Sequence, residues 1–367
     1  MSSAPITPAL RLDATKVERN CRRMRERLQA EGVTLRPHVK TAKNVEVARM
    51  AVGAASGPIT VSTLREAEYF FEHGFRDILY AVGIAPAKLE RVLALAQRGA
   101  DIAVVVDSVE AARAVSKLGG GVHALIEIDS DGHRAGIRPG DAQLIDVGRA
   151  LGSSLRGVMT HAGDSYNCGG VDGIRAVAAR ERLAVVNCAN ALGAAGMRCP
   201  VVSVGSTPTA TFADSFEGVT EVRVGVYVFH DLVMAGLGVC SLDDIAISVV
   251  ASVIGHQREK QWLITDGGWM AMSRDRGTAR QKVDKGYGLV CGMDGKPIDD
   301  LIVSDANQEH GIISRRGGGP IDFDRFPVGT TVAILPNHAC ATAAQFEAYE
   351  VFEGNKSMGR WERVNGW

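Results

Sequence analysis

The sequence predicts an α/β protein in which a TIM-type (β/α)8 barrel is followed by a second, mainly β domain. Eight short apolar runs alternate with helix-like segments over roughly 230 residues, and this count and spacing are typical of the barrel. The runs are apolar on both faces, as expected of parallel strands that helices cover. After Leu242 the helical periodicity fades, and Gly-punctuated, strand-like segments replace it. An open, doubly wound sheet is the alternative, but the count of eight and the lack of a GxGxxG turn favour the barrel.

The predicted strands of the barrel are rich in β-branched residues. They cover residues 34–41, 58–63, 77–83, 101–108, 123–130, 155–163, 199–207 and 221–229. Segments rich in Ala, Leu, Arg and Glu separate them, and we expect helices within residues 64–74, 85–99, 109–121 and 173–196. Later strand-like runs lie at 245–256, 261–269 and 330–339. We therefore expect a barrel domain over 15–242 and a β-rich domain over 243–367 that also takes in residues 1–14.

Composition excludes several classes of protein. The 367 residues carry a formal net charge of −1 and no basic run interleaved with aromatic residues, which argues against nucleic-acid binding. No apolar stretch is long enough to cross a bilayer, and the first residues lack the pattern of a secretory signal. The seven cysteines include no CxxC pair, so they do not resemble a disulfide framework. We expect a cytoplasmic protein with no membrane partner.

The first predicted strand ends in a lysine. Strand ends form the mouth of a (β/α)8 barrel, where its chemistry takes place, and "RPHVKTAK" puts Lys40 there. Partly dehydrated surroundings would favour the neutral amine, which can form a Schiff base with an aldehyde. A surface lysine that extends into solvent is the ordinary alternative for such a position.

The loops after the seventh and eighth strands resemble a phosphate site. "VGSTPTA" supplies Gly205, Ser206 and Thr207, and "RVGVY" begins with Arg223. Loops after these two strands form the recurrent phosphate site of the barrel, and they adjoin the first strand in a closed ring. A phosphate at one end and a lysine-bound aldehyde at the other fit pyridoxal 5'-phosphate (PLP). Taken alone, a Gly/Ser/Thr/Pro cluster is usually a turn. Arg223 suits a position facing the ring nitrogen of the cofactor, or an ion pair with Glu221.

"LPNHACATAAQF" contains His338 and Cys340, two positions apart. On a strand, such residues share a face, so an imidazole and a thiolate could converge on one metal ion. This donor pair favours zinc over harder ions, and two protein ligands leave coordination positions open, as a catalytic metal needs. A core histidine beside a buried cysteine is the ordinary alternative. The β-rich domain is thus predicted to bind a metal.

Seven motifs in order resemble the family of D-serine dehydratases and D-threonine aldolases, which are fold-type III PLP enzymes with an alanine-racemase-like barrel. They are "RPHVKTAK", "IEIDSDGHRAG", "THAGDSY", "VSVGSTPT", "VRVGVYVFHD", "NQEHG" and "PNHACAT". "TVSTLREAE", "DRGTARQK" and the terminal "WERVNGW" are most similar to the branch that dehydrates D-threo-3-hydroxyaspartate. The chain departs from the family at Ala42, where a histidine is frequent.

The resemblance implies roles for individual residues. It implies that Lys40 is the Schiff-base lysine, that Tyr166, Thr207, Gly225 and Val226 lie around PLP, and that His338 and Cys340 bind the metal. Zinc is the expected ion, with manganese, cobalt and magnesium as alternatives. The family resemblance and the prevalence of twofold assemblies also lead us to expect a homodimer.

The expected reaction removes the β-hydroxyl of a D-3-hydroxy amino acid and yields a 2-oxo acid and ammonia. The alternatives are retro-aldol cleavage, D-serine dehydration, racemization and a PLP-carrying barrel without catalysis. Substrate contacts are expected among His133 and Arg134 after the fifth strand and His310 in "NQEHG". A second carboxylate on the substrate would need a cation, and one segment supplies Arg274, Arg276, Arg280 and Lys282. The ordinary alternative for this charged run is a solvated face.

Overall fold

The structure is a computed structural model that describes residues 6–119, 121–132, 134–354 and 356–367. The chain divides into two compact units, which we describe separately. The barrel unit comprises Cys21–Tyr227 and Val364–Trp367, and the β-rich unit comprises Met1–Asn20 and Val228–Arg363. No helix of the described residues is both long and apolar enough to cross a membrane. The predicted fold class is confirmed; the domain limits drawn from the sequence stay a prediction.

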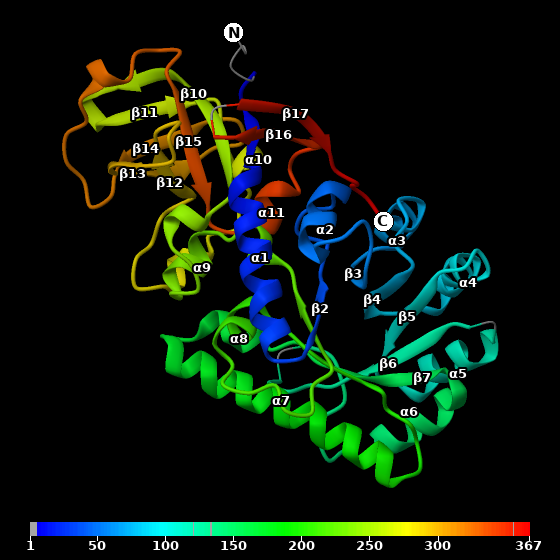
Figure 1. The fold of residues 1–367 in the computed structure, drawn as a ribbon. Helices are drawn as coiled ribbons and strands as arrows, with labels where there is room; N and C mark the ends of the chain where they lie inside the picture. Colours follow the sequence, from blue (N-terminus) through cyan, green and yellow to red (C-terminus); the bar gives the residue numbers. More distant parts are fainter. Residues whose placement is uncertain (1–5, 120, 133, 355) are drawn as a thin grey trace. The chain divides into compact units, whose positions relative to one another are not determined.

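All eight predicted barrel strands are present and parallel (Figure 1). They run in the order β2-β9-β8-β7-β6-β5-β4-β3, so each strand lies beside its neighbour in sequence except that β2 pairs with β9. Their bounds are β2 Thr34–Pro37, β3 Ile59–Val61, β4 Asp77–Gly83, β5 Asp101–Val106, β6 His123–Glu127, β7 Leu155–Met159, β8 Val201–Val204 and β9 Glu221–Val224.

The ring closes between β2 and β3 through a single parallel bridge that joins His38 to Thr60. The N–H of Val39 donates to the carbonyl of Thr60 across this closure, at 2.9 Å. Closure brings the carboxyl ends of all eight strands to one rim. The loops that leave this rim carry the residues that the sequence analysis singled out.

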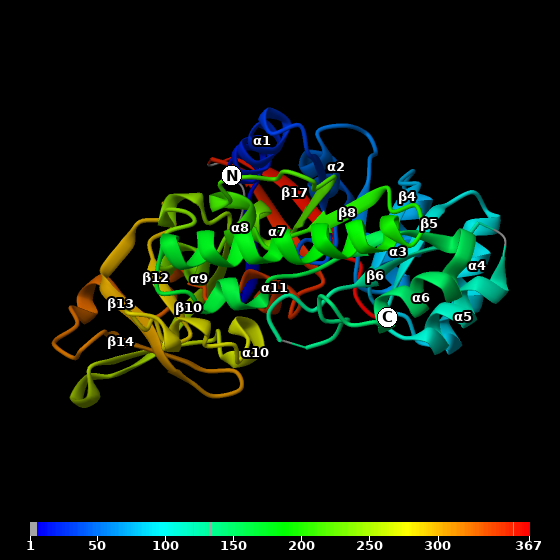
Figure 2. The ribbon, with the colours of Figure 1, turned by 90° about the horizontal axis from the view of Figure 1, so that it is seen from below.

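Helices cover the outer face of the barrel strands, and side chains of the preceding residues cap several of them. Asn44, Thr63 and Ser108 each accept the backbone N–H three residues ahead, which satisfies an otherwise unpaired donor of the first turn. The long α7 lies alongside α8 (Figure 2). The helix bounds are α1 Ala14–Ala30, α2 Val45–Val52, α3 Leu64–Glu72, α4 Leu89–Gln97, α5 Val109–Leu118, α6 Gln143–Leu151, α7 Val171–Ala194 and α8 Thr207–Phe212.

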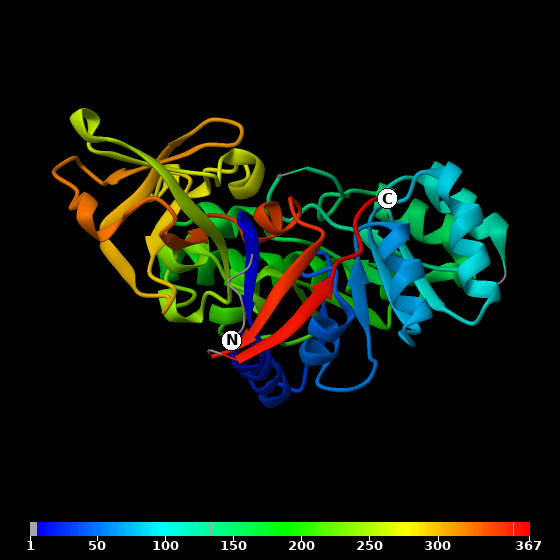
Figure 3. The ribbon, with the colours of Figure 1, turned by 90° about the horizontal axis from the view of Figure 1, so that it is seen from above.

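The β-rich unit is built on a nine-stranded sheet in the order β11-β14-β13-β12-β15-β10-β1-β16-β17. The N-terminal strand β1 lies between β10 and β16, antiparallel to one and parallel to the other (Figure 3). The apolar core of the β-rich unit includes Leu232, Ile245, Leu289, Cys291, Ile302, Ala333 and Leu335. The strand bounds are β1 Ala9–Asp13, β10 Ile247–Gln257, β11 Trp262–Thr265, β12 Gly288–Cys291, β13 Pro297–Ala306, β14 Gly311–Arg315, β15 Thr331–Pro336, β16 Ala348–Glu353 and β17 Lys356–Glu362, and the short helices are α9 Leu232–Gly236, α10 Trp269–Met272 and α11 Ala339–Ala343.

A layer of charged side chains crosses the barrel among its apolar residues. Arg36 of β2 pairs with Glu221 of β9 and with Asp77 of β4, each at 2.7 Å. Ser203 of β8 donates to Glu221 at 2.6 Å and itself accepts from Arg223. Buried charges are tolerated only when they are paired and hydrogen-bonded, so this layer ties four strands together.

Strands β7 and β8 approach each other closely at Gly157. A Cβ atom on Gly157 would lie 1.9 Å from the carbonyl oxygen of Val201 in the neighbouring strand. Gly157→Ala should therefore force the strands apart and lower the free energy of unfolding by more than about 3 kcal/mol, measured by urea denaturation. Gly193→Ala is the control, because a Cβ there meets nothing within 4 Å and the site is an exposed part of α7. It should raise stability by up to about 1 kcal/mol. Equal stabilities for the two variants would contradict the prediction.

Candidate functional site

Lys40 lies in the turn after β2, at the rim where the strands end. We expected partly dehydrated surroundings for Lys40, but its side chain is exposed in the chain alone, so that expectation is wrong. The reason is that β2 ends at Pro37, and the lysine lies beyond it in the turn. The nearby Lys43 is only partly exposed, and its Nζ pairs with the fully buried Glu66 at 3.0 Å. Lys40 is thus the lysine of "KTAK" whose position suits a ligand at the rim.

The loop after β8 has features that fit a phosphate-bearing ligand. The hydroxyl Oγ1 of Thr207 is buried and has no hydrogen-bond partner among the described residues. A buried unsatisfied hydroxyl is costly, and a phosphate oxygen would supply the partner it lacks. Ser206 instead caps α8 and bonds to Ser165 of the preceding loop at 2.8 Å. These residues therefore fit PLP at the predicted position, with Thr207 as a contact and Ser206 as part of the loop frame.

Two glycines let the backbones around the rim approach closely. Gly205 has φ +157°, and a Cβ on it would lie 1.8 Å from the carbonyl oxygen of Arg223. A Cβ on Gly225 would meet the hydroxyl of Thr41 at 2.9 Å, next to the turn that carries Lys40. Val226, which follows Gly225, is buried. The structure thus brings the loops after β8 and β9 together with the turn after β2.

Arg223 projects from β9 and is only 5% exposed. Its guanidinium donates to the hydroxyl of Ser203 and to the carbonyl of Thr160. Burial lowers its pKa, and the carboxylates of Glu221, Glu181 and Glu127 oppose that effect. Glu221 forms its close ion pair with Arg36 rather than with Arg223. The guanidinium is therefore held in place by neutral acceptors.

The loop after β7 holds the predicted Tyr166 and a histidine that the sequence analysis did not select. His161 lies 6.1 Å from the Tyr166 ring between centroids, and its Nδ1 lies 2.6 Å from the carbonyl oxygen of Gly205. Burial and the charge of Lys40 lower the pKa of His161 to about 3. The same two causes place the pKa of His38 well below its usual value. Both imidazoles are neutral at pH 7. His161 follows the end of β7 in "THAGDSY". The rule that selected Lys40, that residues after strand ends lie at the mouth of the barrel, could therefore have identified His161 as well.

Two predicted substrate residues follow β6. Arg134 lies 3.8 Å from the carboxylate of Glu127. Burial raises the pKa of Glu127, and Arg134 opposes the shift. His133 lies outside the described residues.

His338 and Cys340 occupy a strand-to-helix turn in the β-rich unit. The prediction that both lie on one strand is wrong, because β15 ends at Pro336 and Cys340 is already in α11, with His338 directly before the helix. The turn still brings their side chains within hydrogen-bonding distance. Among the described residues no group of three or more His, Cys, Asp or Glu side chains is arranged to hold a metal ion. The pair fits a metal as two soft or borderline donors with coordination positions left open.

A carboxylate that the sequence analysis did not select holds His338. Nδ1 of His338 lies 2.6 Å from Oδ2 of Asp275, which leaves Nε2 for another partner. Burial opposes protonation, but the bonds with Asp275 and Cys340 raise the pKa of His338 to about 11. The buried Asp231 accepts the N–H of Ala339 at 2.9 Å and so fixes the start of α11. Asp275 lies between Arg274 and Arg276, where it looked like one member of a solvated charge run.

The four basic residues after α10 are all exposed, but they differ in their contacts. Arg274 lies over the ring of Trp269, and Arg276 pairs with Asp284 at 2.9 Å. Arg280 and Lys282 form no ion pair with any other residue that the structure describes. His310 is exposed in the connection between β13 and β14. This connection contacts α10, because the N–H groups of Trp269 and Met270 donate to the carbonyls of Asn307 and Gln308.

Comparisons with known proteins agree with this architecture. Residues 12–232 match the model of the alanine racemase N-terminal domain, and residues 246–352 match that of a putative serine dehydratase domain. D-threo-3-hydroxyaspartate dehydratase of Delftia sp. (strain HT23) is 53% identical over 98% of both chains. D-serine dehydratase of Dictyostelium discoideum is 30% identical over 96% of this chain and 94% of its own. These relatives are dehydratases, which are lyases, so the expected enzyme class is confirmed.

Two solved mutants of D-threo-3-hydroxyaspartate dehydratase are also similar. A histidine-to-alanine mutant has a TM-score of 0.97, with 52% identity and coverage of 99% of this chain and 96% of its own. A cysteine-to-alanine mutant in the metal-free form has a TM-score of 0.96, with 52% identity and 99% coverage of both chains. One residue separates the two substituted positions in that enzyme. This chain therefore belongs to the family of alanine-racemase-like, PLP-dependent enzymes that includes the D-serine and D-threo-3-hydroxyaspartate dehydratases.

Proposed function

We propose that the chain is a PLP- and metal-dependent dehydratase that acts on D-threo-3-hydroxyaspartate. The products would be oxaloacetate and ammonia, because loss of water from the substrate is followed by hydrolysis of the resulting imine. The observation that carries the proposal is the 53% identity, over 98% of both chains, to an enzyme of that name. The residue set at the rim of the barrel supports it.

The barrel unit is proposed to hold PLP. Lys40 would bind the cofactor covalently, Thr207 would donate to its phosphate, and Gly225 and Val226 would line the site with Tyr166. Bound PLP delocalises the negative charge that develops when the α-proton of an amino acid leaves. The Lys40 amine is the proposed base for that proton, since it lies at the rim. Arg223, fixed by Ser203 and Thr160, would supply a fixed positive charge at the ring nitrogen.

The β-rich unit is proposed to hold the metal through His338 and Cys340. The spacing of the substituted residues in the two mutants matches this pair, and one of those mutants is metal-free. A bound divalent ion supplies a Lewis acid that makes the β-hydroxyl a better leaving group. We propose zinc, because a His/Cys pair favours a borderline ion, with manganese, cobalt and magnesium as alternatives. A homodimer and a cytoplasmic location are further proposals.

Product analysis tests the function. Purified protein loaded with PLP and zinc is mixed separately with D-threo-3-hydroxyaspartate, D-serine and D-threonine, and 2-oxo acid and aldehyde are both assayed. We expect oxaloacetate from the first substrate at the highest kcat/KM. Lys40→Ala should lower kcat by at least about 100-fold, because the base is lost. Lys43→Arg, which can keep the pair with Glu66, is the matched control and should stay active.

Other products would reject the proposal in distinct ways. Glycine and glyoxylate from 3-hydroxyaspartate would identify an aldolase. PLP binding with no turnover of any substrate would identify a carrier.

Metal affinity tests the role of Asp275. A carboxylate that orients a metal-binding histidine typically contributes 10- to 100-fold to affinity, so we expect Asp275→Asn to weaken zinc binding by about that factor. The measurement is competition with a chromophoric chelator. Asp284→Asn is the control, since Asp284 lies in the same segment and pairs with Arg276. Unchanged zinc affinity in Asp275→Asn would show that His338 needs no support from this carboxylate.

Substrate discrimination tests the basic segment. Arg280 and Lys282 form no ion pair among the described residues, so they are the proposed partners of the second substrate carboxylate. Loss of such a contact typically costs about 2–5 kcal/mol, so Arg280→Met or Lys282→Met should lower kcat/KM for 3-hydroxyaspartate by roughly 30-fold or more. D-serine lacks that carboxylate and should be affected far less. Lys296→Met, at an exposed cation elsewhere in the unit, is the control. Equal losses for both substrates would mean that the run is a solvated face.

A further inference from the structure

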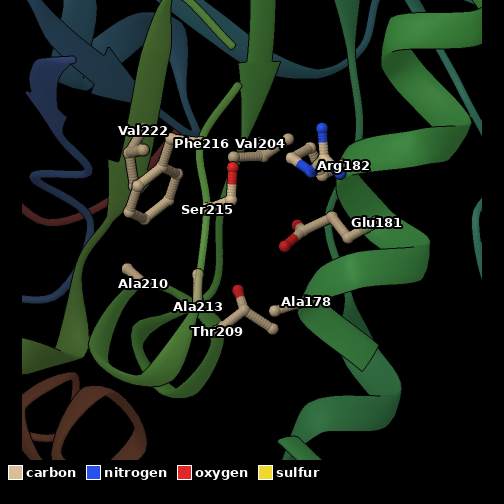
Figure 4. Close-up of a pocket in the computed structure, with 10 residues that line it drawn as sticks. All are labelled: Ala178, Glu181, Arg182, Val204, Thr209, Ala210, Ala213, Ser215, Phe216 and Val222. Carbon is tan, nitrogen blue, oxygen red and sulfur yellow. The ribbon is translucent and has the colours of Figure 1, made fainter. Parts of the chain in front are cut away.

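The buried face of α7 contains one carboxylate in an otherwise mainly apolar stripe. Glu181 is 2% exposed and follows Ile174, Val177 and Ala178 on this face, with Val185 after it. A leucine would be the ordinary residue at such a position, because an ionisable group is costly to bury without partners. Figure 4 shows the Glu181 carboxylate projecting from α7 into a small pocket, with Thr209 on its far side.

The Glu181 carboxylate accepts hydrogen bonds from two of the loops that carry proposed cofactor residues. Its Oε1 receives the N–H of Ala162, after β7, at 3.1 Å and the N–H of Gly205, after β8, at 2.8 Å. The side chain of Thr209 in α8 also favours the ionised carboxylate. A single oxygen atom thus ties together two loops that are otherwise separate in sequence.

These bonds belong to a closed ring. Ser165 donates to the carbonyl of Ala162 at 2.7 Å and bonds to Ser206 at 2.8 Å. Ser206 bonds to Thr209 at 2.9 Å and directly follows Gly205, whose N–H leads back to Glu181. Every side chain in this ring is buried. Buried networks of this kind rigidify a site when all members are satisfied and are costly when one member is lost.

We propose that Glu181 is a positioning residue for the cofactor site. It acts as a hydrogen-bond acceptor that holds the loops after β7 and β8 in register. It touches no reacting group, and it acts through Tyr166 and Thr207, which those loops carry. The inference rests on the proposed binding of PLP at this rim.

The charge of Glu181 is not what the loops require in this arrangement. Burial raises its pKa, while Gly205, Thr209 and Arg223 favour the ionised form. Backbone N–H groups need only an acceptor oxygen, and the side-chain amide of glutamine offers one in the same place. Glutamine should therefore preserve the function of Glu181, whereas leucine should not.

The experiment measures the affinity of the full-length apoprotein for PLP, without substrate, by equilibrium dialysis. Glu181→Leu leaves two buried N–H groups without acceptors, so the loops should rearrange and the Kd for PLP should rise at least about tenfold. Glu181→Gln should bind within about threefold of the wild type. Val185→Ala is the matched control, because it destabilises the same face of α7 and leaves the ring intact. It should bind PLP like the wild type.

A second variant keeps the test decisive if Glu181→Leu does not fold. Ser165→Ala opens the same ring at a different point with a minimal change of volume, and it should weaken PLP binding about three- to tenfold. Wild-type affinity in both Ser165→Ala and Glu181→Leu would overturn the proposal, as would a loss in Glu181→Gln as large as that in Glu181→Leu. If Glu181→Leu does not fold, wild-type affinity in Ser165→Ala alone would overturn it. Failure of the wild type to bind PLP would overturn it together with the cofactor assignment. Normal PLP binding without turnover of D-threo-3-hydroxyaspartate would reject only the proposed function.

Discussion

The pairing of β2 with β9, together with the single bridge from His38 to Thr60, closes the ring of strands on which the barrel site depends. Without the pairing of β2 with β9, the turn after β2 and the loops after β8 and β9 would lie at opposite edges of an open sheet. With it, Lys40 and the loops that carry Thr207 and Gly225 share one rim. Parallel pairing of strands far apart in sequence is costly in chain entropy, so its stabilisation has to come from the barrel interior.

The charged layer inside the barrel contributes to this stabilisation and also determines which groups Arg223 contacts. Arg36 of β2 binds Glu221 of β9 across the β2–β9 pair, and Ser203 links Glu221 to Arg223. Removal of one partner from a buried pair typically costs about 3–5 kcal/mol, because the remaining charge is unpaired. The same pairing reserves Glu221 for Arg36 and leaves the guanidinium of Arg223 bound to neutral acceptors. The ion pair between Arg36 and Glu221 therefore both joins β2 to β9 and determines the contacts of Arg223.

The sequence was sufficient for residues whose place follows from a strand end. Lys40, Thr207 and Arg223 were selected because each lies at or beside the carboxyl end of an apolar run, and such ends meet at the rim of a barrel. Gly225 came from the family resemblance alone. His161 obeys the same rule and could have been found. The eight strands themselves were predictable because parallel strands covered by helices are apolar on both faces.

Residues whose contacts lie far away in sequence could not be identified from the sequence. Glu181 stands between Arg180 and Arg182, so the local pattern resembles a solvated helix face, and only the packing of α7 shows that its side chain is buried. Asp275 likewise lies between two arginines, and its contact with His338 spans 63 positions. The strand expected for His338 and Cys340 was wrong because β15 stops at Pro336, and a turn, rather than the period of a strand, brings the two side chains together.

Glu181 and Asp275 hold other residues in place and are not themselves proposed to contact a ligand. In the proposed arrangement the residues that contact ligands, such as Lys40, Thr207 and His338, lie in a turn or where a loop enters a helix, and loops have the greatest backbone freedom. A carboxylate from another segment then removes that freedom, through backbone N–H groups in the barrel and through an imidazole in the β-rich unit. A carboxylate suits this task because its oxygens accept several hydrogen bonds at once and it donates none when ionised. In the proposed arrangement, the exposed cations that would bind the second substrate carboxylate are thus separate from the two carboxylates that hold the cofactor loops and His338.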